Sequence, residues 1–153
     1  MIDSYFMNLG NTLIASKSDE TFNCVICDFG FANFTSDVQA KIVKGVKRPT
    51  TNGITYRYAA PELFYSKSIS MQRLSSEIYK KVDVYAYAMT IYNVYLRAKP
   101  WGSLSQDEIE KRVLNGERPE LSIGDDNIKE VIEAAWDQDP AKRPDFDSIL
   151  EKL

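Results

Sequence analysis

The residues best suited to redox or metal chemistry are Cys24 and Cys27, the two cysteines of the chain, which form a CxxC pair. A zinc site requires four ligands, and the 153 residues include no histidine and no further cysteine to complete the set. The segment from Phe22 to Cys27 is also typical of a strand, in which positions i and i+3 point to opposite faces. We therefore interpret both cysteines as small buried hydrophobic residues. The absence of histidine also excludes Ser-His-Asp and Cys-His catalysis.

Two short motifs indicate a different chemistry. The run Asp28-Phe29-Gly30 directly follows the predicted strand, and the run Ala60-Pro61-Glu62 follows a long stretch without periodicity. In this order the two motifs resemble the ends of a protein-kinase activation segment. Either tripeptide alone is a weak signal, but the two together, with the expected elements around them, are specific.

Further matches extend the resemblance from Asn11 to Leu153. The stretch from Gly53 to Tyr58 looks like the substrate-docking loop in its Ser/Thr-kinase form, and the stretch from Gly116 to Pro119 is similar to the tyrosine-kinase-like group. The remaining matches are to the start of the family's central helix and to its closing signature: Asp83 to Tyr87, Trp136, Asp139-Pro140 and Arg143-Pro144. The resemblance implies a partial kinase domain over residues 1–153, with a catalytic-loop remnant at 4–11, an activation segment at 28–62 and a helical subdomain at 63–153.

The resemblance implies that ATP and Mg²⁺ are the cofactors. Asp28 matches the carboxylate that binds Mg²⁺ against the ATP phosphates, and Asn11 aligns with the residue that holds a second Mg²⁺. Taken alone, Asn11 also fits a turn-forming residue at the start of a strand, but the strand pair and the motif after it favour a ligand. Phe29 matches the residue that packs under the N-terminal lobe and reports the active or inactive state.

Four residues have structural roles in the family. Glu62 and Arg143 match a buried ion pair that joins the activation segment to the last helices, and loss of one partner of such a pair costs about 3–5 kcal/mol. Asp83 matches a residue that caps the catalytic-loop backbone, although an acidic residue is also common at a helix start. We interpret Trp136 as a core residue.

The catalytic loop departs from the family pattern. Counting back from Asn11 places Phe6 at the position of the catalytic Asp and Asn8 at that of the catalytic Lys. Phe6 has no lone pair to orient the substrate hydroxyl, and Asn8 has no cation to stabilise the transferring phosphoryl group. Thr55, whose hydroxyl bonds both residues in the family, therefore lacks both partners. No catalytic residue is intact by this alignment.

The same loop bears on regulation. Ser4 stands at the position of the family's His and Tyr5 at that of the Arg that receives activation-loop phosphate. Thr50 and Thr51 resemble loop phosphosites, but a solvated threonine pair is the simpler interpretation. No Gly-rich loop or strand lysine precedes the hairpin, so we expect the N-terminal lobe to be absent and an apolar groove beside the segment from Val84 to Leu96 to be exposed.

The elements that must position these residues are mostly helical. A hairpin is expected from Thr12–Ala15 and Phe22–Cys27, followed by a long loop at Asn33–Gly53 and a polar insertion at Ser66–Glu77. Helices are expected at Pro61–Tyr65, Val82–Leu96, from the capping box Ser105–Glu108 to Asn115, at Asp125–Asp137 and at Phe146–Leu153. The fold class is therefore mainly α, a kinase-like C-lobe with a short N-terminal β-hairpin.

The composition restricts the partners. A net charge of −3 argues against a nucleic-acid partner, which usually meets a basic face. The longest apolar stretch, from Val84 to Leu96, is shorter than the roughly 20 residues that span a bilayer, and no secretory signal is evident, so we expect a cytoplasmic protein without a membrane anchor.

Three interpretations stay open from the sequence. The chain is the C-lobe part of a Ser/Thr kinase that phosphorylates protein substrates with ATP, a pseudokinase-like scaffold that binds a protein partner, or a fragment without function. In each case the isolated chain is expected to be inactive, because positioning and charge stabilisation are nearly the whole mechanism of phosphoryl transfer.

Overall fold

The computed structural model describes residues 2–3, 9–18, 21–27, 33–34, 55–65 and 75–153. Their β-strands are β1 Ile2–Asp3, β2 Thr12–Lys17, β3 Phe22–Ile26 and β4 Asn33–Phe34. Their α-helices are α2 Pro61–Tyr65, α3 Ser76–Leu96, α4 Gln106–Leu114, α5 Asp126–Ala135 and α6 Phe146–Leu150. Short 3₁₀ turns occur at Leu9–Asn11, Tyr56–Tyr58 and Pro140–Lys142. The mainly helical fold class is confirmed.

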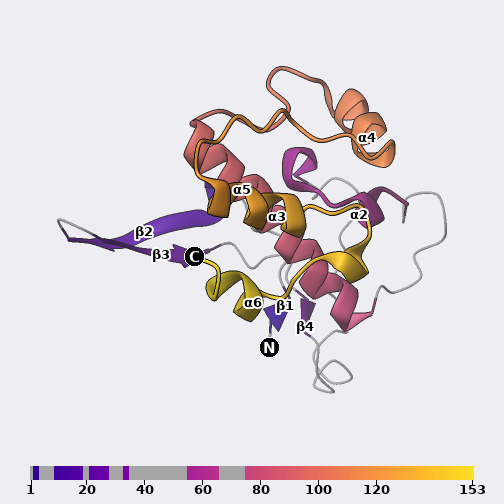
Figure 1. The fold of residues 1–153 in the computed structure, drawn as a ribbon. Helices are drawn as coiled ribbons and strands as arrows, with labels where there is room; N and C mark the ends of the chain where they lie inside the picture. Colours follow the sequence, from indigo (N-terminus) through magenta and orange to yellow (C-terminus); the bar gives the residue numbers. More distant parts are fainter. Residues whose placement is uncertain (1, 4–8, 19–20, 28–32, 35–54, 66–74) are drawn as a thin grey trace.

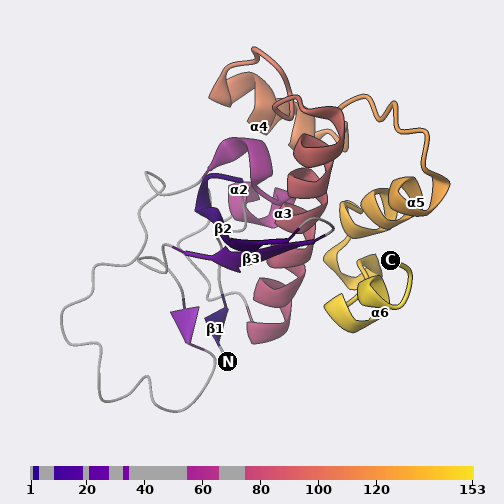
Figure 2. The same cartoon turned by 90° about the vertical axis from the view of Figure 1, so that its left-hand side faces the viewer.

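Helix α3 is the central element, and the other helices lie around it (Figures 1 and 2). Its middle turns bury consecutive residues, which explains why the sequence is apolar nearly all round. Against it packs α5, whose stripe of apolar residues is fully buried as the 3.6-residue periodicity predicted: Ile128, Val131, Ile132 and Ala135. The rings of Tyr92 and Trp136 lie 6.3 Å apart, and Trp136 is buried as expected.

The described strands form two small antiparallel sheets, β1 with β4 and β2 with β3. The β2–β3 hairpin was predicted, and it projects away from the helices (Figure 1). Its register shifts between Ile14 and Ser16, so β2 has an irregularity that β3 lacks. The segment from Asn33 was predicted to be a loop throughout, but Asn33–Phe34 pairs with Ile2–Asp3; a two-residue bridge has no periodicity to detect. The rest of that predicted loop lies outside the described residues.

Two helix boundaries were wrong. Helix α3 begins at Ser76 rather than Val82, because the Ser75 hydroxyl accepts a hydrogen bond from the Ile78 amide and caps a polar first turn. The last helix is only Phe146–Leu150, and of its predicted apolar stripe Ile149 alone is buried, while Leu150 is 74% exposed. By contrast, α4 has the predicted capping box and ends before Gly116, whose φ of 81° is the left-handed conformation common after a helix.

The interpretation of the cysteines as buried was wrong for Cys24, which is exposed, while Cys27 is half-buried. The reason is that no described element covers β3, all five residues of which are exposed. Of the apolar residues of α3 that were expected to border an exposed groove, those that are exposed lie near the end of the helix. Val94 is 53% exposed and Tyr95 is 49% exposed, whereas residues such as Val84 and Met89 are buried.

Candidate functional site

The segment from Thr55 to Tyr65 is the part of the predicted activation segment that the structure describes. It consists of an exposed Thr55, the turn Tyr56–Tyr58 and helix α2, whose first residue is Pro61. Proline suits this position because a first-turn residue has no intrahelical bond for its amide. Ala59, Ala60 and Phe64 are buried, and the Phe64 ring lies 5.6 Å from the Tyr56 ring. The segment is therefore packed onto the helical body rather than free above it.

Glu62 and Arg143 form the ion pair that the sequence predicted. The Arg143 Nη1 and Nη2 atoms donate to the two carboxylate oxygens of Glu62 at 2.7 and 2.9 Å. The Arg143 side chain is fully buried and that of Glu62 is 12% exposed, so the pair is shielded from solvent. Two-point pairing of this kind fixes orientation as well as distance. It joins α2 to a residue 81 positions later in the chain.

Arg143 is also bonded to the backbone around it. Its Nε donates to the Asp137 carbonyl at 2.9 Å, and Nη1 donates to the Lys81 carbonyl at 2.8 Å. The Lys81 side chain also bonds to Arg143, since its Nζ donates to the Arg143 carbonyl at 2.6 Å. The Asp137 and Lys81 carbonyls, together with the Glu62 carboxylate, replace the water that the buried guanidinium has lost.

A second arginine, Arg57, links the segment from Thr55 to Tyr65 to the loop between α3 and α4. Arg57 donates from Nη1 to the Pro100 carbonyl at 2.8 Å and from Nη2 to the Leu104 carbonyl at 3.2 Å. These carbonyls flank Trp101, a buried residue with a φ of 67°, which is a strained conformation for a bulky side chain. Arg57 therefore fixes the α3–α4 loop and the segment from Thr55 to Tyr65 relative to each other.

A third link is made by Tyr58, whose hydroxyl donates to Asn93 Oδ1 at 2.9 Å. Asn93 is a buried polar residue of α3, and its amide donates to the Ala98 carbonyl at 2.8 Å. The segment thus has three polar links to the body, one each from Arg57, Tyr58 and Glu62.

Tyr85 lies at the centre of this network. The guanidinium carbons of Arg118 and Arg143 are each 5.1 Å from its ring centroid, which is the geometry of a cation–π contact. Burial raises the pKa of the Tyr85 phenol to about 12, against the opposing effect of the two arginines. Burial likewise lowers the pKa of Arg118. The Tyr85 hydroxyl has no hydrogen-bond partner among the described residues.

The expected cofactor site is described only in part. Asn11 is half-buried at the end of the turn before β2, and the Cys27 amide donates to its carbonyl at 2.8 Å. The residue before Asp28 is therefore directly across the hairpin from Asn11, despite the long sequence gap. The described residues contain no group of three or more His, Cys, Asp or Glu side chains that could hold a metal.

Several predicted site residues lie outside the described part of the chain: Ser4, Tyr5, Phe6, Asn8, Asp28, Phe29, Gly30, Thr50 and Thr51. Asp83 is half-buried on α3, two residues before Tyr85. Sequence reasoning did not assign roles to Arg57, Asn93 or Arg118. The available signals were a polar residue inside an apolar helix for Asn93, and charged residues beside aromatic or proline residues for the two arginines.

Comparison with known proteins agrees with this geometry. Residues 8–153 match the family model of protein tyrosine and serine/threonine kinases. The chain belongs to the protein kinase family. A probable serine/threonine-protein kinase of Dictyostelium discoideum is 30% identical over 126 residues, which are 82% of this chain and 12% of the relative. Serine/threonine-protein kinase VIK of Arabidopsis thaliana is 30% identical over 145 residues, which are 94% of this chain and 30% of the relative.

The crystal structure of the Rad53 kinase domain and SCD2 has the same fold. It superimposes with a TM-score of 0.70 over 99% of this chain and 46% of that chain, at 18% identity. The kinase chain described here therefore corresponds to about half of that solved structure and to a minor part of each relative above. None of the described helices is long and apolar enough to cross a membrane.

Proposed function

We propose that the segment from Thr55 to Tyr65 is the protein-substrate docking side of a Ser/Thr-type kinase domain, whose reaction is ATP-dependent phosphorylation of protein serine or threonine. The observation that carries the proposal is the buried pair of Glu62 and Arg143, with Nη1–Oε1 at 2.7 Å. A docking surface must keep its shape when a substrate binds, and three polar links to the body serve that requirement. The Ser/Thr preference is supported by Thr55 and by the Ser/Thr-kinase relatives.

Asn11 and Asp28 are the proposed ligands of Mg²⁺ in this kinase domain. An amide oxygen and a carboxylate oxygen are the hard donors that Mg²⁺ prefers. The bond between the Cys27 amide and the Asn11 carbonyl supports their proximity, since it places the neighbour of Asp28 opposite Asn11. When bound, the ion would neutralise phosphate charge on ATP, while these two residues hold and orient it.

We further propose that the isolated chain does not transfer phosphate. Phe6 and Asn8 stand where the family has the Asp and the Lys that act on the reacting atoms. The proposed docking side of the domain retains its anchoring residues, such as Glu62 and Arg143. The side that acts on the phosphate lacks its reactive Asp and Lys.

The test is a thermal-unfolding and phosphate-transfer experiment on the full chain with Mg·ATP and a mixture of basic proteins as acceptors. We expect no incorporation of labelled phosphate above the protein-free blank and no shift of the melting temperature. A ligand at a hundredfold excess over its Kd stabilises by about 2.7 kcal/mol. Any incorporation that depends on Mg²⁺ would contradict the proposed inactivity, whereas a stabilisation of that size without incorporation would contradict only the expected absence of nucleotide binding.

A protein-binding scaffold is the second candidate, favoured by the exposure of Val94 and Tyr95 on α3 (53% and 49%). If a protein partner binds there, Val94→Arg should abolish its co-purification with the chain. Gln106→Arg, at an exposed position of α4, is the control for one added charge. Equal loss of the partner in both variants would contradict binding at this end of α3.

A further inference from the structure

The loop between α3 and α4 contains a tight turn at residues 99–102. The Gly102 amide donates to the Lys99 carbonyl at 3.1 Å, so Pro100 and Trp101 are the two central residues of a β-turn. The proline ring holds the φ of Pro100 near about −65°, whereas the φ of Trp101 is 67°. A negative φ followed by a positive φ defines a type II turn.

Trp101 occupies a position of this turn that usually holds glycine or asparagine. The position requires a positive φ, at which a Cβ atom crowds the backbone. The Trp101 side chain is buried, and its Nε1 has no hydrogen-bond partner among the described residues. Two unfavourable features of the structure are thus located on one residue. Strained backbone of this kind is concentrated at active sites and at segments that change conformation.

A type I turn is the alternative that relieves the backbone strain. The two turn types differ mainly by a rotation of the peptide plane between the central residues. The ψ of Pro100 changes from about 120° to about −30°, and the φ of Trp101 changes to about −90°. The hydrogen bond from Gly102 to Lys99 is common to both types. The Pro100 carbonyl, however, points to the opposite side of the turn after the rotation.

Arg57 bonds to the carbonyl that this rotation moves. Its Nη1 donates to the Pro100 carbonyl at 2.8 Å, and its Nη2 donates to the Leu104 carbonyl at 3.2 Å. Both nitrogens belong to one planar guanidinium, so the bond to Leu104 also orients the donor that meets Pro100. A hydrogen bond from a charged donor is stronger than one between neutral groups. Arg57 therefore favours the strained type II turn over the type I turn.

We infer that the Pro100–Trp101 peptide is a two-position element that Arg57 holds in its strained orientation. When the guanidinium is removed or is drawn to another acceptor, the peptide rotates and the turn becomes type I. Leu104, the second acceptor, directly precedes Ser105, which is the N-cap of α4. The rotation thus links the segment that contains Arg57 to the start of α4.

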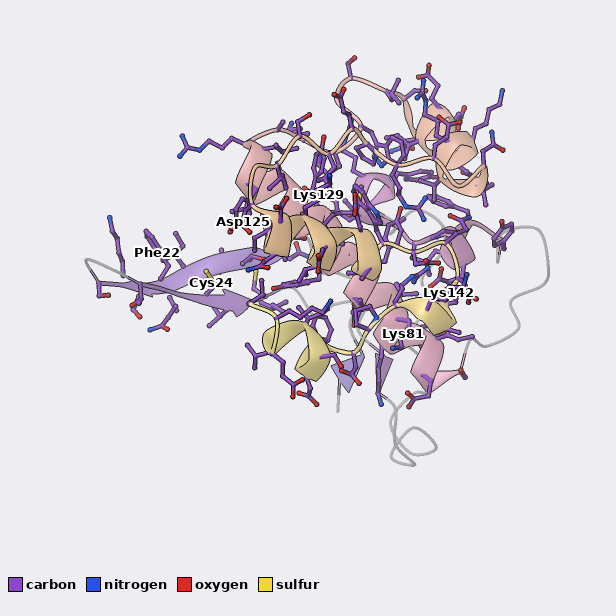
Figure 3. The ribbon with its side chains drawn as sticks, viewed as in Figure 1. Phe22, Cys24, Lys81, Asp125, Lys129 and Lys142 are labelled. Carbon is purple, nitrogen blue, oxygen red and sulfur yellow. The ribbon has the colours of Figure 1, made fainter. Side chains whose placement is uncertain are left out.

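The two-position element lies in the helical body. Pro100 and Trp101 are both buried there. Figure 3 shows Phe22 and Cys24 on the projecting hairpin, apart from α4, which follows the turn. The inference therefore does not depend on what covers the hairpin. It also does not depend on whether the segment that contains Arg57 binds a substrate.

Nuclear Overhauser measurements on the full chain report the orientation of the peptide directly. In a type II turn the Pro100 Hα lies close to the Trp101 amide proton, whereas in a type I turn the Pro100 Hδ protons lie close to it instead. We expect the Hα cross-peak to dominate in the unmodified chain, and the ratio of Hα to Hδ intensity to fall at least about fivefold in Arg57→Gln. An unchanged ratio in Arg57→Gln would overturn the inference, because burial of the indole ring alone would then hold the turn.

Arg112→Gln is the matched control. It also removes one arginine, but this side chain is exposed and its Nη1 donates to Glu117 at 3.2 Å rather than to the turn. We expect the ratio to stay at its unmodified value. An equal fall in Arg57→Gln and Arg112→Gln would overturn the inference, since it would assign the rotation to a change in net charge.

Arg57→Lys is the milder variant, which keeps the test valid if Arg57→Gln does not fold. Lysine keeps the charge but has no planar fork to bond two carbonyls at once, so the ratio should fall by at least about twofold. An unchanged ratio in Arg57→Lys would also overturn the inference.

Trp101→Gly tests whether strain drives the rotation. Glycine adopts a positive φ without a steric cost, so adding Arg57→Gln to Trp101→Gly should leave the turn type II. A fall in the ratio as large as the fall caused by Arg57→Gln alone would show that strain at residue 101 is not the cause.

Discussion

The helical body and the β2–β3 hairpin differ in how deeply their side chains are buried and in how far apart in the sequence their bonded residues lie. In the body, Arg143 and Tyr85 are at most 1% exposed, and polar groups of the segment from Thr55 to Tyr65 are bonded to residues far away in the sequence. In the hairpin, every residue of β3 is exposed, and its bonds are to the adjacent strand. The side-chain hydrogen bonds described above for the segment from Thr55 to Tyr65 are thus with the helical body and not with the hairpin. Substitutions of the same kind should therefore have large effects in the body and small effects in the hairpin.

The largest effect is expected from Glu62→Ala. It leaves the buried Arg143 guanidinium without its carboxylate, which should lower the free energy of unfolding by about 3–5 kcal/mol. Urea unfolding measures the change. The control is Glu77→Ala, which removes an exposed ion pair with Lys80 (2.9 Å) and should cost under about 1 kcal/mol. Similar costs for the two variants would show that burial does not govern the strength of the Glu62 link.

The next effect compares two isoleucines. Ile132 is fully buried on α5, so Ile132→Ala should cost about 2–5 kcal/mol through the cavity it creates. Ile14 is 63% exposed on β2, and Ile14→Ala in dilute protein should cost under about 1 kcal/mol. Denaturant midpoints at equal slope give both values. A cost at Ile14 that equals the cost at Ile132 would mean that the hairpin is packed as tightly as the body.

Alkaline pH should weaken the body through Tyr85. Its folded pKa is raised from 10.0 to about 12, so the folded state holds the proton more tightly than the unfolded state. The corresponding stability is complete below about pH 10 and is lost as the pH rises through about 12, with a loss of about 1 kcal/mol by pH 11. Burial also raises the pKa values of Tyr87 and Tyr92, which contribute to both proteins. Comparison of unfolding curves at about pH 9 and pH 11 should therefore show a loss that is greater by this amount in the unmodified chain than in Tyr85→Phe. At neutral pH, Tyr85→Phe should be nearly neutral, because the hydroxyl has no partner among the described residues. An identical alkaline loss in both proteins would assign it to other groups.

The smallest effect compares two serines with the same local bond. The Ser105 hydroxyl accepts from the Glu108 amide at 3.4 Å in the capping box of α4, and the Ser18 hydroxyl accepts from the Thr21 amide at 3.1 Å in the hairpin turn. Ser105→Ala should lower the free energy of unfolding by about 1 kcal/mol. Ser18→Ala should leave global unfolding unchanged, because a hairpin this exposed opens locally before the body unfolds. A global cost at Ser18 as large as that at Ser105 would contradict this independence.

Much of the fold could be predicted because its signals are local. The residues of the capping box at Ser105 lie within a few positions of one another, as do those of the buried stripe of α5, and both predictions were confirmed. The start of α3 was missed because its first turn is polar and is fixed by the Ser75 cap. The stripe of the last helix was misleading, since Ile149 is buried but Leu150 is not. Apolar spacing predicts a face, but whether another element covers that face depends on tertiary structure.

Some residues of the candidate site could likewise be predicted from the sequence and others could not. Glu62 and Arg143 could be paired from the sequence because both belong to recognisable motifs. The partners of Arg57 could not be predicted, because they are the carbonyls of Pro100 and Leu104. Every residue has a backbone carbonyl, so the sequence does not show which one accepts a hydrogen bond. The exposure of Cys24 was missed for a related reason, since it depends on what does not cover β3.

The 81-residue separation of Glu62 and Arg143 also means that the two residues are synthesised at different times. A ribosome adds about 5–20 residues per second, so roughly 4–16 s pass between the synthesis of the two partners. During this interval the Glu62 carboxylate lacks the guanidinium that it pairs with in the folded protein. A chain released before residue 143 would contain Glu62 but never acquire the guanidinium that pairs with it. The final position of α2 is therefore fixed only after a much later part of the chain has been synthesised.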